Sequence, residues 1–120
     1  MIPAASQTST ERVRLARLAE ATLIASARVV ATAGPDGRWV TADAGRPIDG
    51  VVAVAEPSGR VEIGLHADAV WPVDSLEALA EHLREQLRNA AAAAGLGGAV
   101  GSIAVCFHDM VEPVAYPEPA

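Results

Sequence analysis

The chain has 120 residues, which is enough for one hydrophobic core of modest size and too few for two ordinary domains. Hydrophobic residues make up 51% of it but aromatic residues only 3%, so Val, Leu, Ile and Ala must build the core. The formal net charge of -6 disfavours direct adsorption to nucleic acid or anionic lipid, because both require a surplus of basic side chains. We therefore expect no nucleic-acid partner.

The cysteine content and the apolar runs bear on the compartment. The single cysteine, Cys106, cannot form an internal disulfide, which fits a reducing compartment. No stretch approaches the ~20 apolar residues that cross a bilayer, and residues 1–10 lack the pattern of a signal peptide. We expect a cytoplasmic protein without direct membrane insertion.

The N-terminal half predicts one helix followed by β-structure. Residues 1–9 are expected to be a flexible polar tail, and residues 10–27 carry apolar side chains at helical spacing. Residues 28–43 contain β-forming residues around a Gly-Pro-Asp-Gly turn, which predicts a short hairpin. Residues 48–55 then predict a valine-rich strand that turns directly into the next one.

The clearest pattern begins at Arg60. Apolar residues alternate with polar or small ones, which predicts a strand with one core face and one wet face. The core set is Val61, Ile63, Leu65, Ala67 and Ala69, and the wet set is Glu62, Gly64, His66 and Asp68.

An amphipathic helix and a last strand follow. Asp74 is the expected N-cap, with Glu77 at the reciprocal position of a capping box, and the helix should stop at Gly95. Residues 100–111 alternate again as a strand, and residues 112–120 form a Pro-rich tail. The sequence therefore predicts a single α+β domain over residues 10–111, a small three- to five-stranded antiparallel or mixed sheet covered by two helices.

Four segments together resemble a known family. They are residues 50–54, the strand 61–66, the helix 75–87 and the final strand 100–110, which reads VGSIAVCFHDM. This combination resembles the alkaline-shock-protein family, the envelope stress response family of Gram-positive bacteria. The resemblance implies a small cytoplasmic bacterial protein that acts at the cell envelope, through self-association and a membrane-anchored partner. The family has no established catalytic residues to carry over.

Polar residues on the wet strand face raise the possibility of chemistry. Glu62, His66 and Asp68 share that face, and His108 with Asp109 can sit on a neighbouring strand, which is conceivable for a metal or acid/base site. The alternative is that these are ordinary polar side chains on a solvated sheet. Nothing in the sequence fixes a third ligand, so we expect no metal, no cofactor and no catalytic residue.

Cys106 and Trp71 complete the set of candidates. The thiol needs a base beside it to act as a nucleophile, and His66 or His108 can serve across strands, but a half-buried inert thiol is the simpler interpretation. Trp71-Pro72 ends the long strand, where an aromatic side chain is either a contact anchor or a lid over the helix start. The wet face and the sheet edges are further candidate contact surfaces.

These observations favour a non-enzymatic protein. The expected function is a cytoplasmic envelope-stress or envelope-homeostasis role, exercised by homo-oligomerisation and by docking on a membrane-anchored partner. The expected interaction residues are Trp71, Pro72, Glu62, His66 and Asp68. The alternative is a small-molecule sensing or regulatory domain of ferredoxin-like type.

Overall fold

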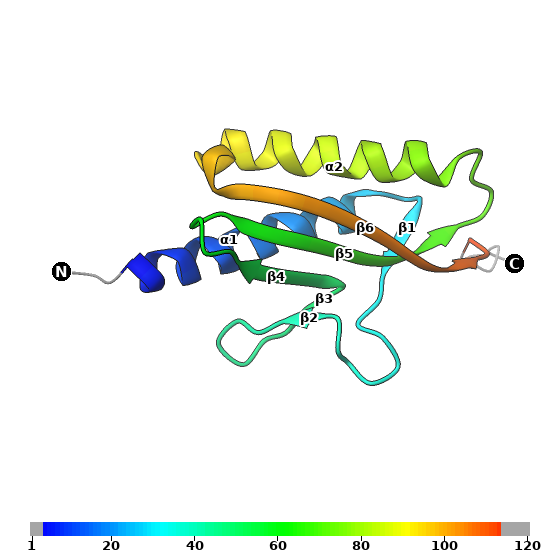
Figure 1. The fold of residues 1–120 in the computed structure, drawn as a ribbon. Coiled ribbons are helices and arrows are strands. Elements are labelled where there is room, and N and C mark those ends of the chain that lie inside the picture. Colours follow the sequence, from blue (N-terminus) through cyan, green and yellow to red (C-terminus); the bar gives the residue numbers. More distant parts are fainter. Residues whose placement is uncertain (1–3, 114–120) are drawn as a thin grey trace, which may run out of the picture.

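The protein folds as two helices packed on a mixed β-sheet, as seen in a computed structural model that describes residues 4–113 (Figure 1). This confirms the predicted α+β class. In chain order the elements are α1 (Ala4–Ala25), β1 (Val29–Ala31), β2 (Val40–Thr41), β3 (Ile48–Asp49), β4 (Val51–Ala55), β5 (Val61–Val70), α2 (Leu76–Ala93), the short 3-10 helix η1 (Gly97–Ala99) and β6 (Val100–Val111).

Strand β5 is the centre of the main sheet. β6 pairs with it in parallel along one edge, as the β5-α2-β6 crossover requires, and β4 and β1 pair with it antiparallel. β2 and β3 form a separate two-stranded ribbon. The predicted hairpin over residues 28–43 is wrong, because β1 pairs with β5 and β2 pairs with β3.

β1 and β4 behave as one edge strand that is interrupted by residues 32–50. Ala31 pairs with Ala67 and Val51 pairs with Leu65, so only His66 lies between the two ladders. There the Thr32 amide donates to the His66 carbonyl (3.0 Å), and the His66 amide donates to the Gly50 carbonyl (2.7 Å). The predicted strand 48–55 is accordingly split at Gly50, whose φ of 77° breaks the extended conformation.

Both helices cover the same face of the sheet. The alternate residues of β5 from Val61 to Ala69 point into the core, as predicted, and pack against buried residues of α1 and α2. The largest fully buried side chains are Leu15, Leu23, Ile48, Ile63, Leu65, Leu83, Leu87, Val51 and Val61. The opposite face, which carries Glu62, His66 and Asp68, has no helix over it (Figure 1).

The ends of the helices differ in part from the predicted ones. α1 begins at Ala4, so residues 4–9 of the expected N-terminal tail are helical, and residues 1–3 of that tail lie outside the described residues. The N-cap of α2 is Ser75, not Asp74: its hydroxyl accepts the Ala78 amide at 3.1 Å, one residue further along than predicted. Both residues suit an N-cap, and composition alone did not separate them. Residues 114–120 of the expected C-terminal tail lie outside the described residues.

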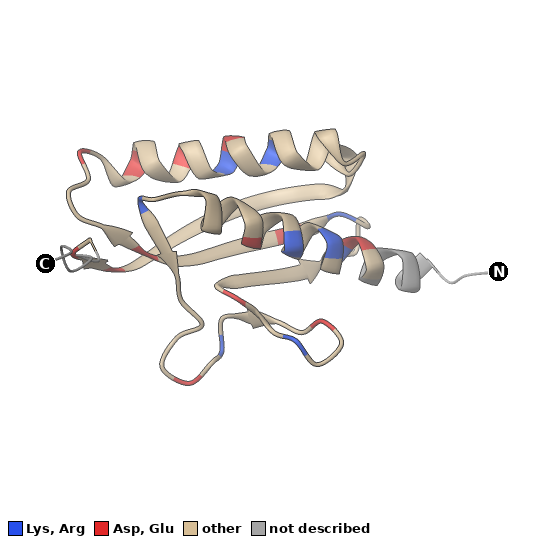
Figure 2. Ribbon diagram, turned by 180° about the vertical axis from the view of Figure 1, so that it is seen from behind, with Lys and Arg blue, Asp and Glu red and all other residues tan. Residues whose placement is uncertain are grey.

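The predicted end of α2 is confirmed. Gly95 has a φ of 76°, its amide donates to the Ala92 carbonyl, and the Leu96 amide donates to the Ala91 carbonyl at 2.8 Å. This pattern is a Schellman motif. Glu77 lies in the first turn of α2, where its charge complements the helix dipole, and the last turn of α2 carries no basic residue (Figure 2).

The edges of the sheet are less open than expected. On the β4 edge, the buried Thr41 hydroxyl donates to the Val51 carbonyl (2.6 Å) and accepts the Ala53 amide (3.1 Å). On β6, the register against β5 is irregular near both ends, and the Arg84 Nε donates to the Ile103 carbonyl at 2.9 Å. Bulges and side-chain caps of this kind protect a sheet from pairing with another chain.

Candidate functional site

The uncovered face of the sheet carries a cluster of three rings, which we call the His-Trp cluster: Trp39, His66 and His108. His66 Nδ1 and His108 Nε2 lie 2.8 Å apart and share a hydrogen bond, with the two imidazole planes only 10° apart. The Trp39 indole is stacked on both, with ring centroids 3.8 Å from His108 and 5.0 Å from His66. His108 lies on β6, the strand next to that of His66, which is the position that the sequence pattern allowed for it.

The backbone around residues 32–50 brings Trp39 over the two histidines. The Trp39 amide donates to the Ala33 carbonyl (3.0 Å), and its carbonyl accepts the Gly50 amide (2.8 Å). Gly34 lies against the six-membered ring of the indole, where an added Cβ atom would come within 2.7 Å of the ring. Trp39 therefore packs against a glycine as well as against the two imidazoles.

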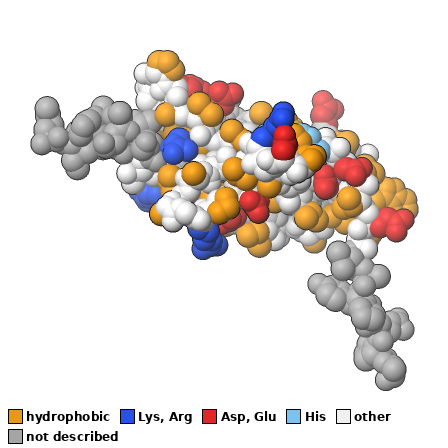
Figure 3. Space-filling view, turned by 90° about the horizontal axis from the view of Figure 1, so that it is seen from below, with side chains coloured by type: hydrophobic (Ala, Val, Ile, Leu, Met, Phe, Trp, Pro, Cys, Tyr) orange, Lys and Arg blue, Asp and Glu red, His pale blue; other side chains and the backbone are white. Residues whose placement is uncertain are grey.

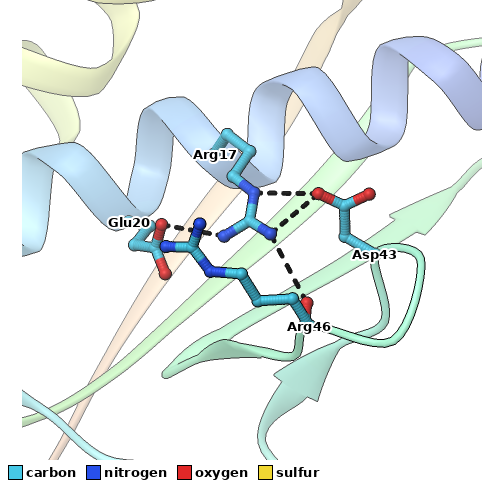
Figure 4. Close-up of polar contacts among 4 residues, drawn as sticks. All are labelled: Arg17, Glu20, Asp43 and Arg46. Atoms are coloured by element: carbon cyan, nitrogen blue, oxygen red, sulfur yellow. Dashed lines mark hydrogen bonds and ion pairs between the residues drawn. The ribbon is translucent and has the colours of Figure 1, made fainter.

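Arg17 of α1 binds the same segment near its other end, at Asp43 and Arg46. Arg17 Nε and Nη2 contact the Asp43 carboxylate at 2.9 and 2.8 Å, and Nη1 pairs with Glu20 at 3.0 Å (Figure 4). Arg17 Nη2 also lies 3.4 Å from the Arg46 carbonyl. Residues 32–50 thus run from the uncovered face around the β4 edge to the helical side of the sheet.

The surroundings of His66 favour its neutral imidazole. Burial lowers the pKa of His66 below its ordinary value of 6.5, and the charge of His108 lowers it further. Within the pair, one ring nitrogen donates and the other accepts. His108 itself is exposed, and Figure 3 shows histidine surface reaching solvent next to acidic and basic side chains.

The distance between the two facing imidazole nitrogens fits a shared hydrogen bond and is too short for two bonds to one metal ion. Metal-bound histidine nitrogens lie about 2.0–2.1 Å from zinc, so two of them in a tetrahedral site are separated by more than ~3 Å. The nitrogens of His66 and His108 face each other at 2.8 Å, which is hydrogen-bond distance. Among residues 4–113, no group of three or more His, Cys, Asp or Glu side chains is placed to hold a metal.

The other polar candidates of the wet face do not join the cluster. Glu62 is exposed and Asp68 half-buried on the same face of β5, and Asp109 is exposed on β6. Cys106 lies opposite His66 in the strand register, but the hydrogen bond of His66 is with His108 and its ring also stacks on Trp39. The structure therefore brings together two of the predicted polar residues and leaves the rest apart.

Trp71 and Pro72 follow directly after β5. The Trp71 side chain is 58% exposed, and nearby Met110 is 42% exposed. Both line a shallow hollow of about 310 Å³ together with Val111 and Glu112. The exposure favours the contact-anchor interpretation of Trp71 over the lid, while Pro72 contributes its carbonyl to Arg28 at 2.7 Å.

A larger hollow of about 500 Å³ lies between α1 and α2. Its lining is rich in alanine and leucine, and Thr22, His82 and Gln86 add polar groups. Neither His82 nor this hollow was singled out as a site from the sequence.

Trp39 is the residue of the cluster that the sequence reasoning missed. It was assigned to a hairpin strand, because its neighbours predict a turn and an extended segment. The available signal was indirect: an aromatic residue beside a glycine-rich turn, and two histidines on the outer faces of two strands. The contact itself depends on a fold that brings residues 39, 66 and 108 together.

Fold and site together define a class: a small α+β domain with one helix-covered sheet face and one uncovered face that carries a histidine pair under a tryptophan. No family model, no curated protein and no solved structure matches this chain. Over the described residues, no helix is long and apolar enough to cross a membrane.

Proposed function

We propose that the protein is a non-enzymatic envelope-stress or envelope-homeostasis protein of the cytoplasm, which acts by self-association and by docking on a membrane-anchored partner. The resemblance of four segments to the alkaline-shock-protein family supports the role. The α+β fold is the architecture which that resemblance implies.

The observation that carries the proposal is the exposure of Trp71 beside Met110. A tryptophan that leaves more than half of its surface in water loses much apolar hydration when a partner covers it. Tryptophan is also enriched among the residues that dominate interface energies. An apolar pair of this kind at one end of a sheet is therefore a suitable anchor for a second protein surface.

The condition of the sheet edges supports the same assignment. Thr41 closes the β4 edge, and Arg84 with two register irregularities protects β6, so strand addition is disfavoured at both. Self-association that avoids these edges must use side-chain surfaces. Trp71 and Met110 provide such a surface, because both are large, apolar and exposed and both line the hollow of about 310 Å³.

The test compares Trp71→Ala with Ile24→Ala. Ile24 is 75% exposed on α1, so its replacement removes a similar apolar surface at a different place. Light scattering across concentration should give a smaller mass for Trp71→Ala than for the wild type and Ile24→Ala. All three should keep the same circular dichroism spectrum, because an exposed side chain contributes little to folding.

Flotation on anionic liposomes completes the experiment. The protein should float only when the vesicles carry a membrane protein that recruits it, because its net charge of -6 opposes direct adsorption. A wild type that is monomeric at all concentrations and floats on bare vesicles would contradict both parts of the proposal.

The hollow between the helices favours one alternative, a small-molecule sensing or regulatory domain of ferredoxin-like type. Its size is within the range of ligand sites, and Thr22, His82 and Gln86 offer hydrogen-bonding groups over an apolar floor. A thermal-shift screen with a metabolite library, repeated with Gln86→Ala, tests it. A hit that stabilises the wild type and not the variant would support this function.

A further inference from the structure

We propose that the His66-His108 pair is a proton-operated latch, which holds Trp39 on the uncovered sheet face and releases it when both imidazoles are protonated. The inference does not depend on the proposed function. It rests on the geometry of the His-Trp cluster and on the way the neighbouring residues are fixed.

The hydrogen bond sets how many protons the pair can hold. Two neutral imidazoles share one N–H between His66 Nδ1 and His108 Nε2, which lie 2.8 Å apart. A first added proton can bind to an outward nitrogen, so the shared hydrogen bond persists and becomes charge-assisted. A second proton must place hydrogens on both facing nitrogens. The pair cannot keep its present geometry in that state.

The loss of the pair is transmitted to Trp39 through stacking. The indole contacts both imidazoles nearly face to face, with interplanar angles of 3° to His66 and 13° to His108. When like charges drive the two rings apart, the flat surface under the indole is lost. His108 is the ring that can move, because it is exposed, whereas His66 is half-buried on the central strand.

The moving part is limited to residues 33–39. Thr41 is buried with its hydroxyl bonded to β4, and Ile48 is fully buried in the core. These two residues keep the β2-β3 ribbon in place. The loop before them is held by the indole and by the bond from the Gly50 amide to the Trp39 carbonyl. Two bonds within the loop, from the Gly37 amide to the Gly34 carbonyl and from the Trp39 amide to the Ala33 carbonyl, keep its turn. Release therefore uncovers the middle of the open face without unfolding the domain.

Six other titratable or charged side chains lie on the same strands or in the loop that carries Trp39. Glu62 and Asp68 lie on the same face of β5, and Cys106 and Asp109 lie on β6. In the loop, Asp36 is paired with Arg38 at 2.7 Å. Within the described part of the chain, none of these six side chains makes a hydrogen bond or ion pair with either imidazole.

The direction of the pH effect follows from the folded state. Because burial and then the charge of His108 lower the pKa of His66 below 6.5, the open state binds protons more readily than the closed one. The closed latch stabilises the position of Trp39 fully at pH values above the ordinary histidine pKa. This stabilisation is lost as the pH falls from there through the lowered pKa of His66 in the closed state.

The experiment follows Trp39 in the Trp71→Phe background, where it is the sole tryptophan. Trp39 emission and the hydrogen exchange of the Gly50 amide are measured between about pH 8 and pH 5, the range in which histidine titrates. The emission should shift to the red at the acidic end. Exchange, corrected for its intrinsic pH dependence, should rise up to about tenfold per pH unit below the second protonation. The far-ultraviolet circular dichroism should stay unchanged.

Two variants and one control decide the result. His108→Gln and His66→Gln should each abolish the acidic transition, and His108→Gln, at an exposed site, keeps the test valid if the other variant misfolds. His82→Gln, on α2, should leave the transition intact. The proposal is overturned if Trp39 emission is flat with pH, if His108→Gln follows the same curve as the background, or if His82→Gln removes the transition.

Discussion

Thr41→Val isolates the contribution of the buried hydroxyl that closes the β4 edge. Thr41 is 3% exposed, and its hydroxyl serves two main-chain groups of β4, the Val51 carbonyl at 2.6 Å and the Ala53 amide at 3.1 Å. Valine has nearly the same shape, so the substitution removes both hydrogen bonds without opening a cavity. It leaves a buried acceptor and a buried donor without this partner.

The expected loss of stability can be worked from these two groups. An unsatisfied buried polar group costs about 1–3 kcal/mol, so the two groups together cost about 2–6 kcal/mol. The additional buried methyl group of valine returns up to about 1 kcal/mol. After this return, the net loss in the free energy of unfolding is about 1–5 kcal/mol. Such a loss lowers the melting temperature by roughly 4–20 °C in a domain of this size.

The assay is denaturant and thermal unfolding followed by circular dichroism, with Thr22→Val as the matched control. The Thr22 hydroxyl donates to the Leu18 carbonyl one turn earlier in α1, an arrangement in which helices gain little from the hydroxyl. The control should change stability by under about 0.5 kcal/mol. If Thr41→Val proves as stable as Thr22→Val, the hydroxyl does not satisfy the β4 edge and the reasoning is refuted.

Two further substitutions test the core and the strand interruption. Leu83→Asp should abolish cooperative unfolding, because Leu83 is 1% exposed between α2 and the sheet and a charge there cannot be hydrated. The control, Asn89→Asp on the exposed side of α2, should melt like the wild type. Gly50→Ala should destabilise by more than about 2 kcal/mol, because its Cβ would lie 2.7 Å from the His66 carbonyl oxygen at a positive φ. Gly37→Ala, with a φ of 67° and no atom within 4 Å of the added Cβ, measures the backbone strain alone, and equal losses in the two glycine variants would disprove the steric argument.

The parts of the fold that local chemistry determines were predictable from the sequence. The alternation from Val61 to Ala69 predicts both the strand and its buried face, since side chains of a strand point alternately to its two sides. Gly95 ends α2 as expected, because a positive φ at this position suits glycine best. The crossover from β5 through α2 to β6 follows from the order of these elements.

The path of residues 32–50 was not predictable in the same way. Trp39 and Thr41 read as a hairpin strand, because their neighbours are β-formers that follow a turn. Their actual partners are His66, His108 and the main chain of β4, which are distant in sequence. Arg17 likewise has no local reason to choose Asp43, which lies 26 residues away. The candidate site depends on these long-range contacts, so sequence patterns could place the two histidines but not the indole that covers them.

The interrupted edge strand makes the domain modular. Since Ala31 and Val51 occupy consecutive same-face positions opposite Ala67 and Leu65, the two halves would join into one regular strand if a single residue bridged them. Residues 32–50 are therefore an insertion into this edge strand, at the register position opposite His66. Such a site allows loops of different length and sequence to be exchanged on an unchanged scaffold. Two proteins with the same sheet and helices can in this way carry quite different surfaces over the same histidine position.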